Sequence, residues 1–242
     1  NAVYGVIVPD KNYFLAAENG YPSLDYDRFY ATLEDKLDFM DFIDIRGLLS
    51  IDDYYRTDTH WRQEKIVDVA ERIADEMGVS LTGEYTKKQL DKPFFGVYYG
   101  QAALPVAAET LYYLENDAIK NSTVYDYESG KTGAVYDMEK AAGNDRYETF
   151  LSGSRSLLII DNPTATTDKE LIVFRDSFGS SLTPLLIEAY SKITIVDIRY
   201  LARLKGCLRG NIGRQTGWCE EVAEKKQTLS NFAILPPNTL PY

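Results

Sequence analysis

Short apolar runs in the last third of this chain most strongly constrain its fold. Leu157–Ile160 and Leu171–Phe174 are continuous apolar runs, and Ile193–Ile198 is a third run of the same kind. Strands buried on both faces of a parallel sheet have this composition. A helix is predicted from about Ser180 to Ser191, with Pro184 acceptable in its first turn. Alternating strands and helices indicate an α/β protein with a mostly parallel central sheet.

The first 78 residues predict two strands, a helix, a strand and a second helix. Val3–Val8 and Tyr13–Ala17 flank the turn signal Pro9-Asp10-Lys11-Asn12 and predict a hairpin. Tyr26–Phe39 has helical spacing of its apolar residues, and Phe42–Leu49 reads as a strand. A second helical stripe runs from Ile66 to Met77, and Gly78 is a fitting stop.

The middle of the chain predicts further strands. Phe94–Tyr99 and Leu111–Leu114 read as strands, while Thr123–Tyr127 and Gly133–Tyr136 flank a turn and predict a hairpin. We therefore expect residues 85–150 to form a β-rich insertion in a single domain spanning residues 1–242. The tail, residues 201–242, has weak periodicity and is expected to be atypical.

Composition excludes some classes of function. The net charge of −11 argues against nucleic-acid binding, which needs clustered Lys and Arg. No apolar run of about 18 residues is present to span a membrane. Because the chain already reads as a strand near Asn1, we infer that the native N-terminus has been removed, together with any targeting segment or membrane anchor. Cys207 and Cys219 do not have the spacing of a metal motif, and no metal or cofactor is expected.

His60 is the only histidine and therefore the only candidate for an imidazole general base. Asp58 lies two residues earlier, and residues i and i+2 of an extended segment face the same side. An aspartate that accepts a hydrogen bond from one ring nitrogen leaves the other nitrogen free to take a proton. The alternatives are a structural histidine and an aspartate that caps the following helix.

Ser177 is the best-placed nucleophile, because it lies between a predicted strand and a predicted helix. Such a turn exposes the hydroxyl at the carboxyl end of the strand, and backbone N–H groups at the helix start point toward a developing oxyanion. Gly179 would let the backbone adopt an unusual conformation close to the substrate. The alternative is that Ser177 only caps the helix.

Two motifs together resemble the DHHW protein family, which is similar to the SGNH-hydrolase-like domains of bacterial alginate O-acetyltransferases. They are Tyr55-Arg56-Thr57-Asp58-Thr59-His60-Trp61 and Arg175-Asp176-Ser177-Phe178-Gly179-Ser180-Ser181-Leu182. The resemblance covers about residues 3–200. It implies an SGNH-like three-layer α/β/α sandwich and a catalytic triad of Ser177, His60 and Asp58, in the permuted order of the acetyltransferase branch.

The resemblance also implies further oxyanion donors, for which the candidates are Gly96 and the turn Gly153-Ser154. Arg199 either supports the site, binds an acidic sugar or pairs with Asp197. The implied protein is bacterial and extracytoplasmic, either secreted or anchored on the outer face of a membrane. Its oligomeric state is left open.

The leading hypothesis is therefore an esterase or O-acetyltransferase that acts on a polysaccharide or another acylated small substrate. A non-catalytic glycan-binding or assembly module of the same fold is the alternative. A lipid or peptide esterase would use the same triad and differ only in its pocket.

Overall fold

A mixed eight-stranded sheet forms the centre of the computed structural model, which describes residues 2–103 and 105–200 and the backbone of residues 229–235. In sheet order the strands are β2 (Asp41–Phe42), β1 (Val3–Ile7), β10 (Leu229–Leu235), β8 (Glu170–Phe174), β9 (Lys192–Val196), β7 (Leu157–Asp161), β5 (Thr123–Asp126) and β6 (Lys131–Gly133). Every pairing from β2 to β9 is parallel, and every pairing from β9 to β6 is antiparallel.

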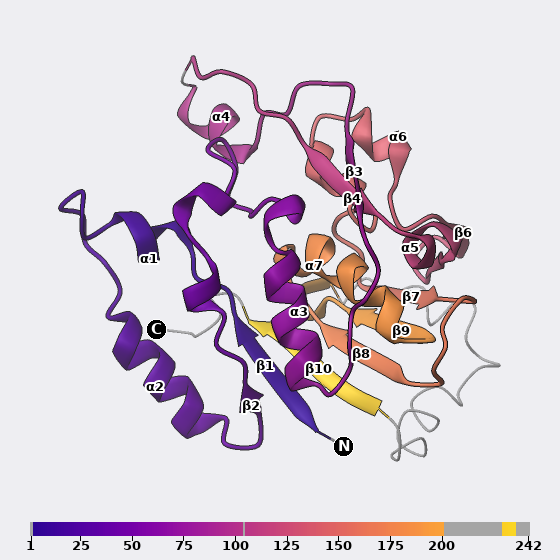
Figure 1. Cartoon of the computed structure of the whole chain (residues 1–242). Coiled ribbons are helices and arrows are strands. Elements are labelled where there is room, and N and C mark those ends of the chain that lie inside the picture. The colour runs from indigo at the N-terminus through magenta and orange to yellow at the C-terminus, as the bar shows by residue number, and fades with distance from the viewer. Residues whose placement is uncertain (1, 104, 201–228, 236–242) are drawn as a thin grey trace.

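The remaining elements are a small antiparallel sheet and short helices (Figure 1). The small sheet pairs β3 (Thr86–Gln89) with β4 (Tyr112–Glu115). The α-helices are α1 (Lys11–Leu15), α2 (Tyr26–Lys36), α3 (Val67–Glu76), α4 (Val97–Ala102), α5 (Asp117–Asn121), α6 (Met138–Ala141) and α7 (Phe178–Leu186). The 3-10 turns are η1 (Arg46–Leu48), η2 (Ile51–Asp53), η3 (Gln63–Lys65), η4 (Arg146–Thr149), η5 (Ile187–Ala189) and η6 (Ile198–Tyr200).

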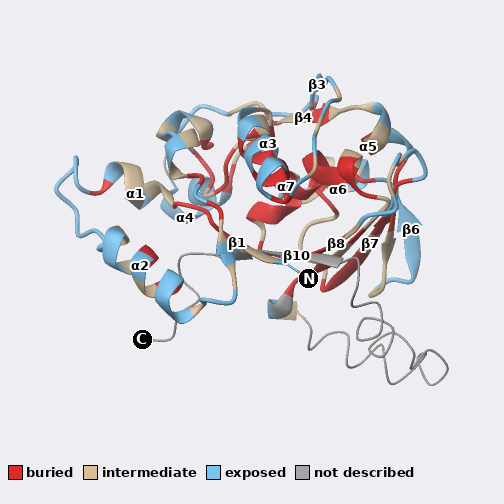
Figure 2. Ribbon diagram, turned by 60° about the horizontal axis from the view of Figure 1, so that its bottom comes forward, coloured by how far each residue is buried: buried red, intermediate tan, exposed pale blue. Residues whose placement is uncertain are grey.

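Helix α7 is buried along its whole length, between the sheet and α3 (Figure 2). Its residues join the main core with the inward side chains of the strands, such as Val6 of β1 and Val173 of β8. Helix α2 instead packs Tyr30 and Leu33 on Ile7, in a separate small cluster. Because neighbouring residues of a strand point to opposite faces, α2 covers the other face of the sheet beside β1. The fold is mixed α/β, and the three-layer sandwich stays a prediction.

Several predicted elements are confirmed. The runs 157–160 and 171–174 form β7 and β8, and the run 193–198 forms β9 up to Val196, after which η6 begins at Ile198. The helices predicted from Tyr26 and Ile66 are α2 and α3. The predicted hairpin around Gly130 is β5–β6, with Gly130 at φ +67° in its turn, but its second strand is Lys131–Gly133 rather than the predicted Gly133–Tyr136. Gly78, at φ +67°, follows the end of α3.

Three predicted strands in the first hundred residues are wrong. Tyr13–Ala17 does not pair with β1, because Asp10 accepts a hydrogen bond from the backbone N–H of Tyr13 and starts α1 instead. In Phe42–Leu49, only Phe42 belongs to a strand, and Arg46–Leu48 forms η1. In Phe94–Tyr99, Phe94 makes a single bridge and α4 begins at Val97.

The predicted β-rich insertion and atypical tail also need correction. Residues 85–150 hold short helices as well as strands, and β5 and β6 extend the main sheet rather than forming a separate unit. The tail contributes β10, which lies between β1 and β8 and pairs in parallel with both. Its run Phe232-Ala233-Ile234-Leu235 suits such a central position. The two cysteines and the rest of the tail lie outside the described residues.

Candidate active site

The segment 54–62 is a compact loop rather than the extended segment expected from the sequence. The Tyr55 N–H donates to the His60 carbonyl at 3.0 Å, and the Arg62 N–H donates to the Asp53 carbonyl at 2.8 Å. Inside this loop, Asp58 Oδ1 accepts from the backbone N–H of His60 at 3.0 Å and from His60 Nδ1 at 2.5 Å. The expected meeting of the two side chains is therefore present, through a turn instead of a strand.

Asp58 is held as a carboxylate by hydrogen bonds from two directions. It is 1% exposed, and burial alone would favour the neutral acid. The bonds from His60, the positive charge that His60 can carry and a bond from the Val97 N–H to Oδ2 at 2.9 Å outweigh burial and lower the pKa of Asp58. A carboxylate can only accept, so it keeps the proton of His60 on Nδ1.

Two aromatic rings hold the His60 imidazole. Tyr147 stacks on it with ring centroids 3.9 Å apart and planes inclined by 11°, and Phe178 lies 5.0 Å away. His60 Nε2 is buried and has no hydrogen-bond partner among the described residues. No described residue therefore occupies the nitrogen that would accept a proton.

Ser177 immediately precedes α7, beside the residue that contacts His60. It is the third residue after the end of β8 and is partly exposed, while its neighbour Phe178 is buried against the imidazole. Ser177 makes no side-chain cap bond; Asp176 Oδ1 instead accepts from the Phe178 N–H at 2.9 Å. Within the described part of the chain, neither the Ser177 hydroxyl nor its N–H is hydrogen-bonded. The structure pairs Asp58 with His60 and does not join His60 to Ser177 by a hydrogen bond.

Gly96 and Gly179 have other uses than the sequence suggested. The Gly96 N–H donates to Thr57 Oγ1 at 3.0 Å, so it is occupied. A Cβ at Gly96 would lie 2.2 Å from Asp58 Cβ, so the glycine allows α4 to approach Asp58 closely. Gly179 lies inside α7 without a left-handed φ.

The turn Gly153-Ser154 is tied to the serine turn by Arg175. Leu151, Ser152 and Gly153 all have positive φ, at 53°, 56° and 72°. Left-handed conformations at non-glycine residues are costly and cluster at functional sites. The Gly153 carbonyl accepts from Arg175 Nη2 at 2.9 Å. The Ser154 N–H has no partner in the described part of the chain.

The buried side chain of Arg175 links the 151–154 turn to helix α7 through hydrogen bonds. Its side chain is fully buried and donates through Nη1 to Ser180 Oγ at 2.6 Å, with Asp197 Oδ2 at 3.9 Å. Burial lowers the pKa of Arg175, and the charge of Asp197 partly compensates.

Arg199 forms the ion pair with Asp197 that was one of its expected roles. Its Nε and Nη2 donate to the two carboxylate oxygens of Asp197 at 2.9 and 2.7 Å. This bidentate pair raises the pKa of Arg199. The same carboxylate thus faces both Arg175 and Arg199.

Sequence reasoning missed Glu109 and Tyr147. Glu109 accepts from the backbone N–H groups of Arg56 and Thr57 at 2.9 and 2.7 Å and from Thr57 Oγ1 at 2.6 Å, which fixes the loop that carries Asp58. Tyr147 donates to or accepts from Ser181 Oγ at 2.8 Å while it stacks on His60. Neither residue belongs to a local motif, so no sequence signal marked them.

No metal centre is evident in the region that the structure describes, where no group of three or more His, Cys, Asp or Glu side chains has suitable geometry. Among the same residues, no helix has the length and apolar character needed to cross a membrane.

The chain belongs to the DHHW protein family, whose sequence model matches residues 45–196 and so includes both motifs of the site. No curated protein matches the chain. A DHHW family protein from Eubacterium siraeum is structurally similar, with a TM-score of 0.68 at 18% identity over 98% of this chain and 78% of that one.

Two further solved structures are similar at lower identity. Bacillus cereus PatB1, solved with a sulfonyl adduct, has a TM-score of 0.68 at 16% identity over 96% of this chain and 81% of that one. The O-acetyltransferase domain of Pseudomonas putida AlgJ has a TM-score of 0.47 at 12% identity over 98% and 75%. At these identities, the similarities to the Eubacterium siraeum protein and to PatB1 show a shared fold.

Proposed function

We propose that this chain is a serine-dependent acyl-transfer enzyme, an esterase or O-acetyltransferase whose substrate is a cell-surface or secreted polysaccharide. One observation carries the proposal: a buried Asp58–His60 pair, with a free Nε2, packs against the turn that bears Ser177. A histidine held only for structure has no need of a carboxylate on one nitrogen and an unpaired second nitrogen. That arrangement is what a general base requires.

In the proposed reaction, Ser177 Oγ attacks the ester carbonyl while His60 Nε2 takes the hydroxyl proton. Asp58 holds the imidazole in place and stabilises its positive charge. The oxyanion of the tetrahedral intermediate accepts hydrogen bonds from the free N–H of Ser177 and from the N–H of Ser154. Collapse breaks the ester C–O bond, and His60 returns the proton to the leaving alcohol. The acyl-serine then passes its acyl group to water or to a sugar hydroxyl.

The comparisons support this proposal at the level of the fold and family. PatB1 was solved with a sulfonyl adduct, and sulfonyl reagents react with nucleophiles. We extend the proposal to an SGNH-like three-layer arrangement and to an extracytoplasmic bacterial location, which the family resemblance implies.

Burst kinetics with p-nitrophenyl acetate test the function. The wild-type chain should release a burst of p-nitrophenolate proportional to the enzyme concentration. Ser177→Ala should abolish it, and His60→Gln should slow it by several orders of magnitude. An equal burst from Ser177→Ala would overturn the proposal.

A non-catalytic glycan-binding module is the second candidate, and one observation favours it. Ser177 and His60 make no hydrogen bond with each other. Catalytic hydrogen bonds often tighten only when substrate binds, so this observation does not outweigh the buried pair. The absence of any burst from the wild-type chain would favour the binding module.

A further inference from the structure

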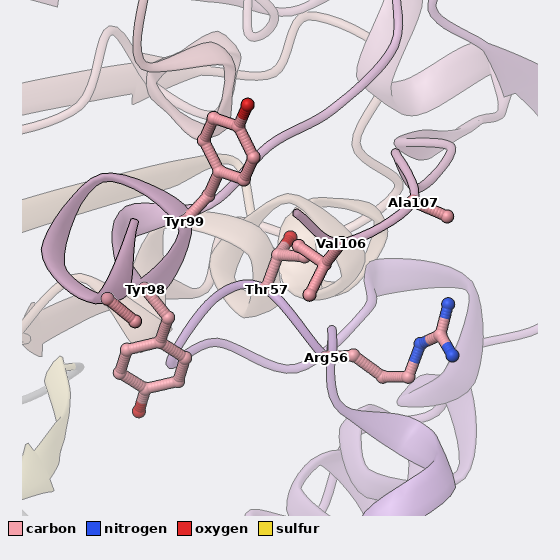
Figure 3. Close-up of a pocket in the computed structure, with 7 residues that line it drawn as sticks. Arg56, Thr57, Tyr98, Tyr99, Val106 and Ala107 are labelled. Carbon is pink, nitrogen blue, oxygen red and sulfur yellow. The ribbon is translucent and has the colours of Figure 1, made fainter. Parts of the chain in front are cut away.

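A pocket of about 270 Å³ opens beside Thr57, the residue that precedes Asp58. Figure 3 shows Tyr98 and Tyr99 at one end of the pocket, Arg56 and Ala107 at the other, and Thr57 and Val106 between them. The Tyr98 N–H donates to the Thr57 carbonyl at 3.0 Å. A backbone hydrogen bond therefore links the wall of the pocket to the loop that carries Asp58 and His60.

The tyrosine wall offers ring surfaces to the solvent. Tyr98 and Tyr99 are 37% and 41% exposed, although both carry large apolar rings. Neighbouring side chains hold both rings: Phe95 packs on Tyr99 with ring centroids 4.5 Å apart, and Lys11 Nζ lies over the Tyr98 ring, 4.8 Å from its centroid. Pre-positioned aromatic faces suit a ligand with one apolar face and polar edges, as a sugar ring has.

Arg56 supplies an unpaired positive charge at the other end. Its backbone N–H binds Glu109, but among the described residues its guanidinium makes no hydrogen bond or ion pair. In contrast, the nearby Arg62 is paired with Glu109 at 3.2 Å. A free, exposed guanidinium in a chain with a net charge of −11 suits a carboxylate, sulfate or phosphate group of a ligand.

A second pocket adjoins the first and shares Arg56. It measures about 330 Å³ and is also lined by Arg62, Glu109 and Tyr112. Arg56 therefore stands between two hollows, each large enough for a small ring. This shape suits an elongated ligand with consecutive rings better than a single acyl group.

We infer that this pair of pockets is a binding subsite for an anionic oligosaccharide, with one sugar ring at the end formed by Tyr98 and Tyr99 and an anionic group of a neighbouring ring on Arg56. The identification of the ligand as a glycan rests on the proposed function. The binding itself needs no reaction at Ser177, so it is measured in the Ser177→Ala background. A failure of this inference is thereby separate from a failure of the burst.

Calorimetric titration with matched oligosaccharides tests the inference. Tetragalacturonic acid should bind at least about tenfold more tightly than its methyl ester, which has the same rings without the charges. Arg56→Gln should remove this preference. The control Arg72→Gln removes an exposed arginine of α3, paired with Glu76 outside both pockets, and should leave binding unchanged.

One further variant and one further ligand test which groups of the ligand the subsite recognises. Tyr98→Ala should weaken both ligands about five- to tenfold, because it removes the ring that both share. A κ-carrageenan tetrasaccharide, which carries sulfate groups and no carboxylate, assigns the subsite to anionic sugars in general if it binds through Arg56, whereas lack of binding assigns the subsite to carboxylates. Equal affinity for acid and ester, equal effects of Arg56→Gln and Arg72→Gln, or no binding of any of these ligands would overturn the inference.

Discussion

At the scale of single residues, the site depends on how tightly the imidazole is held. Asp58 fixes one edge of His60, and Tyr147 covers one face of the ring at 3.9 Å. Tyr147 is itself fixed through Ser181, whose hydroxyl also accepts from Trp61 Nε1 at 2.9 Å. Tyr147 thus acts as a positioning residue for the general base.

We predict that Tyr147→Leu lowers kcat about 10- to 100-fold, because it removes the stacked ring and lets the imidazole tilt. Tyr147→Phe keeps the ring and should retain most of the activity. Because the chain has a single histidine, ¹⁵N spectra report its tautomer without ambiguity. Asp58 should keep the proton on Nδ1 in Tyr147→Leu, but we expect the tilted imidazole to weaken the bond to Asp58 and shift the Nδ1 resonance, whereas a merely structural role would leave this resonance unchanged. The control Tyr136→Phe alters another buried tyrosine, whose hydroxyl binds the Leu114 carbonyl.

Sequence alone could identify the residues with local signatures. Asp58 and His60 were recognisable because they are close in the chain and the histidine is the only one, and Ser177 because it joins a strand to a helix. Tyr147 and Glu109 reach the site only through tertiary packing. Gly96 was read as an oxyanion donor, but its N–H is occupied by Thr57 and its lack of a side chain serves the approach to Asp58.

At the scale of elements, the loop that carries Asp58 is anchored by one carboxylate. Burial would raise the pKa of Glu109, but hydrogen bonds from Thr57 and Arg56 and the charge of Arg62 lower it below its ordinary value. A carboxylate with a depressed pKa in the folded state stabilises the fold above the pKa of the unfolded chain. That contribution is lost as the pH falls through the folded pKa.

We predict that Glu109→Gln lowers the free energy of unfolding at pH 7 by about 1–3 kcal/mol, because the N–H groups of Arg56 and Thr57 and the Thr57 hydroxyl lose a charged acceptor. Below about pH 4.5 the gap between variant and wild type should narrow as Glu109 is protonated. Urea unfolding at pH 7 and pH 3.5 measures both. Glu76→Gln, which breaks an exposed pair with Arg72, should have little effect. A constant gap at both pH values would contradict the assigned role of Glu109.

Helices and strands were predicted correctly where the pattern of apolar residues matches the side of the element that is buried. The predictions failed where a strand-like composition competed with a local helix cap. In helix α3 and strand β8, the apolar residues that predicted each element are the residues that are buried. The stretch Tyr13–Ala17 has a strand-like composition, yet Asp10 caps the N-terminus of a helix there and α1 forms instead. A helix cap such as Asp10, or a close contact such as that of Gly96 with Asp58, depends on individual residues and cannot be predicted from the spacing of apolar residues.

At the scale of the whole molecule, the first and last strands that the structure describes pair with each other within the sheet. Strand β10 lies between β1 and β8, in parallel register from Val3–Asn231 to Ile7–Leu235 on one side and from Leu229–Glu170 to Ala233–Phe174 on the other. The N-terminal strand therefore joins the strand that leads to Ser177 only through β10.

We predict that a chain ending at residue 228 fails to fold cooperatively, because it loses a central strand and leaves two strand edges unpaired. A chain ending at Leu235 keeps every strand that the structure describes and should show a cooperative transition. Circular dichroism and thermal unfolding of the two truncations check this. Equal melting curves for both would contradict the central position of β10.

The central claim, that His60 activates Ser177, is tested most directly by covalent labelling with phenylmethylsulfonyl fluoride and peptide mass spectrometry. The account predicts one sulfonyl group per chain, located on Ser177, with labelling slowed roughly a thousandfold or more in His60→Gln. Labelling at other serines, or an unchanged rate at Ser177 without the imidazole, would contradict it.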